Sequence, residues 1–268
     1  MIHDFNERFE LLKKYFSQNS RYITGARSEI TNETKQKADG SPVTSADQWG
    51  NDYWEDIIKT EFPGEVFIGE ESDSHSYPKD AEYVWYVDPI DGTKEYISGY
   101  GPYYTLIGLA VNGLPAFGIV QEPETGKIIY GSTEQQPILL NGRHDQHQTL
   151  GGIRSWEKTN RVMMRGINAE KRKNLKERLN VDRVRNVGVT HNQLGPLFNK
   201  CSGFISNRAT SYWDICGPAA IMSAAGFDTE FKVGENKVRL NDGSIMADRF
   251  YILPQDAPEE VKKAVMDW

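Results

Sequence analysis

The spacing of hydrophobic residues predicts two helices at the start of the chain. Over residues 4–18 the apolar side chains recur every three or four positions, as one face of a helix requires, and Asp4 stands where a cap would. These side chains are Phe5, Phe9, Leu12 and Phe16. A second helix is predicted over residues 46–62, where the apolar stripe consists of Trp49, Tyr53, Trp54, Ile57 and Ile58. The segment before it, "KADGSPVTSAD", is rich in turn residues and predicts a loop.

The pattern then changes to that of a sheet. "FPGEVFIGEES" contains a turn and a short strand, and "YVWYV", residues 83–87, is hydrophobic throughout, as a buried strand would be. Three further strand-like runs follow, "YTLIGLAV", "LPAFGIVQ" and "KIIYGST". Their short connections, "NG" at 112–113 and "ETG" at 124–126, favour hairpins. We therefore predict an antiparallel meander here.

A polar loop, "NGRHDQHQTLGG", predicts a boundary near residue 150, with one subdomain over residues 1–150 and another over 151–268. Beyond it strands and helices alternate: "RVMMRG" and "GFISN" predict strands, and "NAEKRKNLKERL" predicts an exposed helix. "CGPAAIMSAAG" predicts a helix with Pro218 in its first turn and Gly226 as its C-cap. This alternation is typical of an α/β fold.

Composition limits the possible partners. The net charge of −7 argues against a nucleic-acid polymer or an anionic membrane, although a metal could still attract a small anionic substrate. No apolar run is long enough to span a membrane or to act as a signal peptide, so we expect a cytoplasmic protein, monomeric or homodimeric. Cys201 and Cys216 have no zinc-ligand spacing and are expected to be reduced core thiols.

The most informative stretch is "WYVDPIDGTKEY", in which a hydrophobic strand runs into two acids. Asp88 and Asp91 lie three residues apart, and Pro89 favours an extended conformation for Asp88. Like charges this close repel, so a positive group is expected between them. The alternative is a capped turn, because Asp, Pro and Gly are common turn residues.

The residues after these acids favour anion binding. Gly92 permits a sharp turn, and Thr93 can open a short helix that runs to about Ser98. The backbone N–H groups of Gly92 and Thr93 would then face the same space as the two acids, where a phosphate and a metal could meet.

Two familiar motifs fail on spacing. A calcium-binding helix-loop-helix needs oxygen ligands at alternate positions, but the third and fifth residues counted from Asp88 are Ile90 and Gly92. An aspartyl-phosphate enzyme with an Asp-x-Asp-Gly-Thr motif would need an acid at Pro89.

Other polar residues could join this corner. Glu70 and Glu71 follow a strand and could form a second carboxylate wall or a solvated surface. Asp47 and Asp214 each stand at a helix start, where the simpler role is capping. Arg208 could reach a second phosphate or form a surface salt bridge.

Four blocks, taken together, resemble the inositol-monophosphatase superfamily of magnesium-dependent, lithium-sensitive phosphatases. They are "KADGSPVTSAD", "FIGEES", "WYVDPIDGTKEY" and "YWDICGPAAIMSAAG", and they span roughly residues 35–226. The continuation "DGTKEYI" is most similar to the branch of 3′(2′),5′-bisphosphate nucleotidases, the CysQ type. The resemblance implies an αβαβα layered sandwich with the site between its two parts.

The resemblance also implies roles for the matching residues. Glu70, Asp88 and the backbone carbonyl of Ile90 would hold one Mg²⁺, and Asp88, Asp91 and Asp214 a second. A third, loosely held ion would use Glu70 and waters.

The remaining implied roles concern water and phosphate. Thr93, hydrogen-bonded to Asp47, would orient and deprotonate the attacking water, and the Gly92 and Thr93 amides would bind phosphate. Metal ions that stabilise the attacking and leaving oxygens suit phosphoryl transfer, which needs mainly positioning and charge neutralisation.

The second half departs from the nucleotidase pattern. Gly188 matches a glycine of the branch, but its serine and Leu-Lys pair are missing, "MMRGIN" replaces a Ser-Arg-Ser-His segment, and "AGFDTEF" replaces a double glycine. His191 and Asn192 fall where a substrate-contacting loop is expected, whereas His144 and His147 are expected to be solvated.

The resemblance implies Mg²⁺-dependent hydrolysis of a small phosphomonoester, with adenosine 3′,5′-bisphosphate as the first candidate. Inositol, histidinol or another small polyol phosphate is the alternative substrate. A homologue that binds metal and phosphate without turnover is the alternative of a different class.

Overall fold

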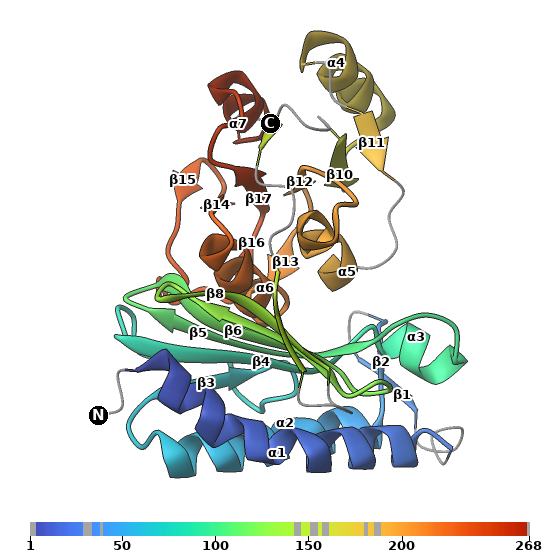
Figure 1. Ribbon diagram of the computed structural model, residues 1–268, viewed down its shortest axis with the longest axis vertical. Helices are drawn as coiled ribbons and strands as arrows, with labels where there is room; N and C mark the ends of the chain where they lie inside the picture. The colour runs from blue at the N-terminus through green and yellow to red at the C-terminus, as the bar shows by residue number, and fades with distance from the viewer. Residues whose placement is uncertain are drawn as a thin grey trace.

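The chain folds into five alternating layers of helices and sheets (Figure 1). The structure is a computed structural model and describes residues 4–28, 34–37, 40–141, 146–150, 155–156, 161–179, 182–184 and 189–266. Helices α1 (Phe5–Ala26) and α2 (Ser45–Glu61) lie under a first sheet, helix α6 (Tyr212–Ala224) lies on its other face, and a second sheet follows with α4 (Ala169–Leu179) and α7 (Glu259–Met266) outside it. The predicted αβαβα layered sandwich is confirmed.

The first sheet has seven strands in the order β3-β4-β5-β6-β7-β8-β9, and only the β3–β4 pair is parallel. These strands are β3 (Val66–Gly69), β4 (Tyr83–Asp91), β5 (Tyr104–Val111), β6 (Leu114–Glu122), β7 (Lys127–Ser132), β8 (Gln135–Asn141) and β9 (Gln146–Thr149). The predicted meander is confirmed, and Asn112 and Gly113 turn the β5–β6 hairpin with positive φ angles of 49° and 76°. Strand β4 was predicted to end at Val87, but it continues through the acidic corner to Asp91.

The second sheet has six strands in the order β11-β10-β12-β17-β14-β15. Its strands are β10 (Arg161–Arg165), β11 (Asp182–Val184), β12 (Gly203–Ser206), β14 (Phe227–Val233), β15 (Asn236–Lys237) and β17 (Arg249–Pro254). The β11-β10-β12 part is parallel, whereas β17 joins antiparallel. Two small ladders pair β1 (Lys35–Gln36) with β2 (Pro42–Val43) and β13 (Thr210–Ser211) with β16 (Met246–Ala247).

Short helices complete the described structure. They are α3 (Thr93–Ser98), α5 (Val189–Gln193) and the 3₁₀ helix η3 (Gly195–Phe198). The predicted helix from Thr93 to about Ser98 is confirmed as α3.

Helix α1 is capped by Asp4 as predicted, but it extends beyond residue 18. Its buried stripe continues through Asn19, whose side-chain amide donates to Thr105 Oγ1 at 3.0 Å and to Gln121 Oε1 at 2.9 Å. The side-chain oxygen of Asn19, Oδ1, accepts a hydrogen bond from Trp54 Nε1 at 3.1 Å. A polar residue therefore occupies a core position because its hydrogen bonds are satisfied there.

Helix α6 differs most from its prediction. It begins at Tyr212, so Pro218 lies inside the helix and not in its first turn. Gly226 follows the C-cap residue Ala225 with a φ of 87°. Most of α6 is buried, because it is enclosed between the two sheets.

Three glycines bring α6 close to the first sheet. A Cβ at Gly217 would lie 2.7 Å from the carbonyl oxygen of Ile107, and a Cβ at Gly108 or Gly118 would collide with the Gly217 backbone. Real side chains do not tolerate such contacts, so α6 rests on β5 and β6 at a distance that only glycine allows.

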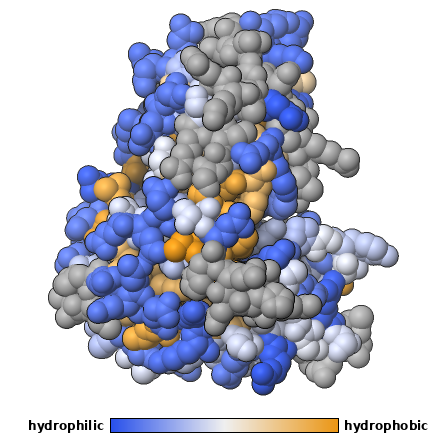
Figure 2. Space-filling view, viewed as in Figure 1, coloured by the Kyte–Doolittle hydropathy of each residue, from blue (hydrophilic) through white to orange (hydrophobic). Residues whose placement is uncertain are grey.

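One large core cluster joins both sheets through α6, and it includes Ile68, Tyr86, Trp213, Phe204 and Phe250. Cys201 and Cys216 are buried and free, as predicted. Within the part of the chain that the structure describes, no helix is both long and apolar enough to cross a membrane. Figure 2 shows a mostly hydrophilic face with hydrophobic residues gathered where the upper and lower parts meet.

We expect Gly118→Ala to lower the free energy of unfolding by about 1–3 kcal/mol, because its methyl group would force α6 away from the sheet. Thermal or urea unfolding of the metal-free protein measures this. Gly25→Ala is the matched control, because Gly25 lies in α1 and a Cβ placed there would have open space for 4 Å around it. If both variants unfold alike, the close contact of α6 with the sheet does not limit stability.

Candidate active site

The acidic corner is built into strand β4 by a bulge. Asp88 pairs with Leu106 and Asp91 with Tyr104, so β4 has one more residue than its partner between these pairs. The Asp88 side chain is 2% exposed, and its Oδ1 accepts a hydrogen bond from the Ile90 N–H at 2.9 Å. The Ile90 side chain packs in a small core cluster, which anchors the turn.

Two further acids approach Asp88 from other elements. Glu70 follows β3, which runs parallel to β4, and the Glu70 N–H donates to the Val87 carbonyl at 2.9 Å. Asp214 lies in the first turn of α6. One ligand oxygen from each of Glu70, Asp88 and Asp214 lies within 4.8 Å of the others, a spacing suited to a shared cation.

Nearly all the residues assigned to the site from the sequence line one cavity of about 480 Å³. These are Glu70, Asp88, Ile90, Asp91, Gly92, Thr93, Arg208 and Asp214. Asp91 lines the cavity but is not part of the three-acid group. Asp47 lies behind Thr93 and does not line the cavity.

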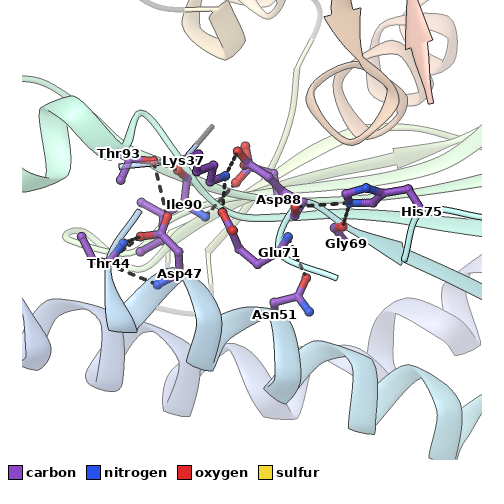
Figure 3. Close-up of polar contacts among 11 residues, drawn as sticks. Lys37, Thr44, Asp47, Asn51, Gly69, Glu71, His75, Asp88, Ile90 and Thr93 are labelled. Carbon is purple, nitrogen blue, oxygen red and sulfur yellow. Dashed lines mark hydrogen bonds and ion pairs between the residues drawn. The ribbon is translucent and has the colours of Figure 1, made fainter. Parts of the chain in front are cut away.

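Asp47 caps helix α2, as the sequence allowed, and it also lies next to Thr93. Its Oδ2 accepts from the Thr44 N–H at 2.8 Å and from the Thr44 hydroxyl at 2.6 Å, which completes a capping box at the start of α2. Its Oδ1 faces the Thr93 hydroxyl at 3.4 Å, as Figure 3 shows. The Thr93 hydroxyl also lies 3.2 Å from the Ile90 carbonyl oxygen.

The electrostatics of the cavity favour a bound cation. Burial, followed by repulsion from Glu70 and Asp91, raises the pKa of Asp88 well above its ordinary value. Burial and repulsion from Asp91 do the same to the pKa of Asp214. Burial also raises the pKa of Asp91 to about 6, with Glu70 adding to the rise. A cation would reverse these shifts, and the all-oxygen donor set fits Mg²⁺.

A protein cation already touches this group of acids. The Lys37 ammonium lies 2.6 Å from Glu70 and also forms an ion pair with Glu71 (Figure 3). Lys37 comes from the β1–β2 segment, far from Glu70 in the chain. Glu71 is thus tied to Lys37 and is not a freely solvated surface acid.

Sequence reasoning missed several residues of the cavity. Arg165 from the end of β10 and Tyr104 from β5 both line it, and so does Lys94. His191, assigned to a substrate loop, lines it too, and its Nδ1 lies 3.1 Å from the Tyr104 hydroxyl. The only signal for Arg165 was the unusual segment "MMRGIN".

Some sequence-based assignments stay predictions. His144 and Gly188 lie outside the described residues. The side chains of His147 and Asn192 also lie outside what the structure describes.

This fold and this acid cluster define a layered α/β protein with a candidate metal centre between its layers. The model of the inositol monophosphatase family matches residues 9–260. The chain therefore belongs to the inositol monophosphatase family.

Similar proteins of known sequence carry phosphatase names. The chain is 35% identical over 114 residues to the bifunctional phosphatase IMPL2, chloroplastic, of Arabidopsis thaliana, covering 42% of this chain and 30% of that protein. It is 34% identical over 106 residues to the histidinol-phosphatase of Chlorobaculum parvum, covering 40% of each. The matched segment thus spans well under half the length of these relatives.

Solved structures share the fold over nearly the whole chain. A staphylococcal inositol monophosphatase-1 has a TM-score of 0.78 at 16% identity, covering 98% of this chain and 96% of that one. An IMPase/NADP phosphatase complexed with NADP and Ca²⁺ has a TM-score of 0.78 at 17% identity, covering 98% and 97%. At these identities the likeness establishes the fold alone.

We expect Mg²⁺ to stabilise the protein more at about pH 7.5 than at about pH 5. The pKa of Asp91 rises from 3.8 to about 6 in the folded state, so the metal-free fold holds a proton that the unfolded chain has released. That contribution to stability is present at low pH and is lost as the pH rises from 3.8 to about 6. Mg²⁺ replaces the lost protons above this window and must displace them within it.

Thermal unfolding with and without Mg²⁺, across this pH range and at matched ionic strength, measures the effect. A Mg²⁺-induced shift that is equal at both pH values would contradict the assignment of these acids to a metal centre.

Proposed function

We propose that the protein is a Mg²⁺-dependent phosphomonoesterase. The observation that carries this proposal is the convergence of Glu70, Asp88 and Asp214, with ligand oxygens within 4.8 Å, beside the Asp47–Thr93 pair. Hydrolysis would join a water oxygen to phosphorus, break the ester P–O bond and release an alcohol and inorganic phosphate.

Two sets of acids would hold the metal. Glu70, Asp88 and the Ile90 carbonyl would hold one ion, and Asp88, Asp91 and Asp214 would hold a second. Magnesium would supply positive charge for the phosphate oxygens of the substrate. The Gly92 and Thr93 amides at the start of α3 would orient the same phosphate.

Thr93 and Asp47 would handle the water proton. Because the Thr93 hydroxyl faces Asp47 Oδ1, its oxygen can accept a hydrogen bond from water in the cavity. Burial raises the pKa of Asp47 to about 6, although the Thr44 hydrogen bonds oppose the rise. Asp47 is therefore suited to take up the proton through Thr93 near neutral pH.

The surroundings of the acids support a substrate with a second anionic group. Arg165 and Arg208 line the same cavity as the acids. Burial lowers the pKa of Arg165. Attraction to Asp214 opposes this decrease, whereas repulsion from Arg208 lowers the pKa further. Two cations that repel each other favour an anion between them.

A neighbouring cavity supports a leaving group with an aromatic ring. It has a volume of about 250 Å³, shares Tyr104 and His191 with the acidic cavity, and has Lys127 and Lys200 in its lining. Its apolar wall consists of Val120, Ile129, Leu139, Leu194 and Phe198. We therefore propose a 3′-phosphorylated nucleotide, such as adenosine 3′,5′-bisphosphate, as the substrate.

Histidinol phosphate is the second candidate, because a histidinol-phosphatase is among the relatives in sequence. Its imidazole would fit the neighbouring cavity, but it lacks a second phosphate for Arg165 and Arg208. Inositol 1-phosphate has neither feature.

We expect Mg²⁺-dependent phosphate release to be fastest with adenosine 3′,5′-bisphosphate, and Asp91→Asn to abolish it by removing a ligand charge. Arg208→Ala should raise KM for the bisphosphate about tenfold, in line with the loss of one charge-assisted contact, with little change for histidinol phosphate. Lys79→Ala, a substitution outside the cavity, is the control. Equal effects of Arg208→Ala on both substrates would reject the second-anion assignment, and no release from any ester would reject the phosphatase itself.

A further inference from the structure

We propose that Gln193 is a positioning residue, which holds the backbone of Asp214 and so orients that carboxylate toward the metal. The inference rests on the proposed magnesium site. It concerns a glutamine that neither the sequence motifs nor the resemblance singles out.

The need for such a residue comes from Pro218. In an α-helix the N–H of each residue donates to the carbonyl four positions earlier, so residue 218 would bond to the carbonyl of Asp214. Proline has no N–H, and Pro218 lies inside α6. The main-chain carbonyl of this candidate metal ligand therefore lacks its helical partner, within a largely buried helix.

Gln193 supplies the missing donor. Its Nε2 donates to the Asp214 carbonyl oxygen at 3.0 Å, from helix α5. Because a carbonyl oxygen only accepts, this contact fixes which end of the side-chain amide faces α6. Gln193 thus provides the hydrogen bond to Asp214 that Pro218 cannot donate.

The other end of the amide shows that the arrangement costs free energy. Gln193 is fully buried, and its Oε1 has no hydrogen-bond partner among the described residues. An apolar side chain of similar shape would avoid that penalty. Among the described residues, the bond to Asp214 is what a glutamine provides here and an apolar residue would not.

The position of α5 makes the contact relevant to the metal. Thr190, on the same short helix, is fully buried and opposes the rise in the pKa of the Asp91 carboxyl, although its Oγ1 has no hydrogen-bond partner among the described residues. The helix therefore bonds one proposed ligand, Asp214, through Gln193, and influences the pKa of a second, Asp91, through Thr190. Groups that orient metal ligands in this way affect metal affinity strongly.

The test is to remove the donor and then to supply it from the helix itself. Gln193→Met keeps a similar shape without an N–H, and we expect it to weaken Mg²⁺ binding about tenfold, measured by titration calorimetry on the metal-free protein. Pro218→Ala in the same chain restores an N–H four residues after Asp214, and the double variant should bind Mg²⁺ within about twofold of the unsubstituted protein. Pro218→Ala alone is the control and should also stay within about twofold.

Thermal unfolding of the metal-free variants separates positioning from simple stability. We expect Gln193→Met to unfold close to the temperature of the unsubstituted protein, because the gain from removing the unpartnered Oε1 offsets the loss of the donor to the Asp214 carbonyl. If Gln193→Met does not fold, Gln193→Asn, whose amide is too short to reach α6, serves in its place.

Three results would overturn the proposal: unchanged Mg²⁺ affinity in the Gln193 variant, no recovery in the double variant, or a loss of metal-free stability that accounts for the weaker binding. If the unsubstituted protein itself binds no Mg²⁺, the proposed function fails. If that protein binds Mg²⁺ and the variant does so equally well, only the role of Gln193 fails.

Discussion

Repulsion between carboxylates that the fold forces together is the constraint on which the site depends. Asp88 is almost fully buried, and Glu70 and Asp214 reach it from two other elements. Neutral side chains at these positions would remove the repulsion, and with it the capacity to hold a cation. Lys37 supplies part of the opposing charge from outside the group, at Glu70 and Glu71. The repulsion destabilises the metal-free fold at this point, and a bound cation or added protons would relieve it.

The geometry of that constraint is set by backbone packing. Gly108, Gly118 and Gly217 let α6 approach the first sheet closely, and the first turn of α6 then places Asp214 over the bulged end of β4. Strand pairing fixes Glu70 next to Val87, and the capping box fixes Asp47 behind Thr93. Helix packing, strand pairing and a helix cap therefore orient these acids, and all three interactions also stabilise the fold.

The sequence predicted those parts of the site that local patterns determine. The strand before Asp88, the turn at Gly92 and the helix from Thr93 all follow from short-range preferences. The same local rules placed Pro218 in a first turn, because proline is favoured there, and they could not reveal that α6 begins at Tyr212. Tertiary burial between two sheets outweighs the proline penalty.

Contacts between distant segments could not be predicted in this way. Arg165 lines the acidic cavity and Lys37 pairs with Glu70, and although "MMRGIN" and "KADGSPVTSAD" contain them, nothing in these segments shows where they lie in the fold. Asn19 is another example, because the helix predicted over residues 4–18 ended before it, whereas partners on β5, β6 and α2 satisfy its side chain in the core. Short motifs predict candidate ligands, but the residues that support them depend on the three-dimensional fold.

The place of α6 on the first sheet has a consequence for how such a protein can diversify. Although Asp214 follows the proposed boundary near residue 150, it is carried by a helix seated on the same sheet as Asp88 and Asp91. The proposed metal ligands therefore all lie on the first sheet or on the helix packed against it. Arg165 and Arg208, in contrast, belong to the second sheet and its loops. Substitutions in those loops would change which ester the proposed site accepts while the spacing between the proposed ligands stays the same. The residues proposed for the metal and those proposed for the substrate can therefore change independently of each other.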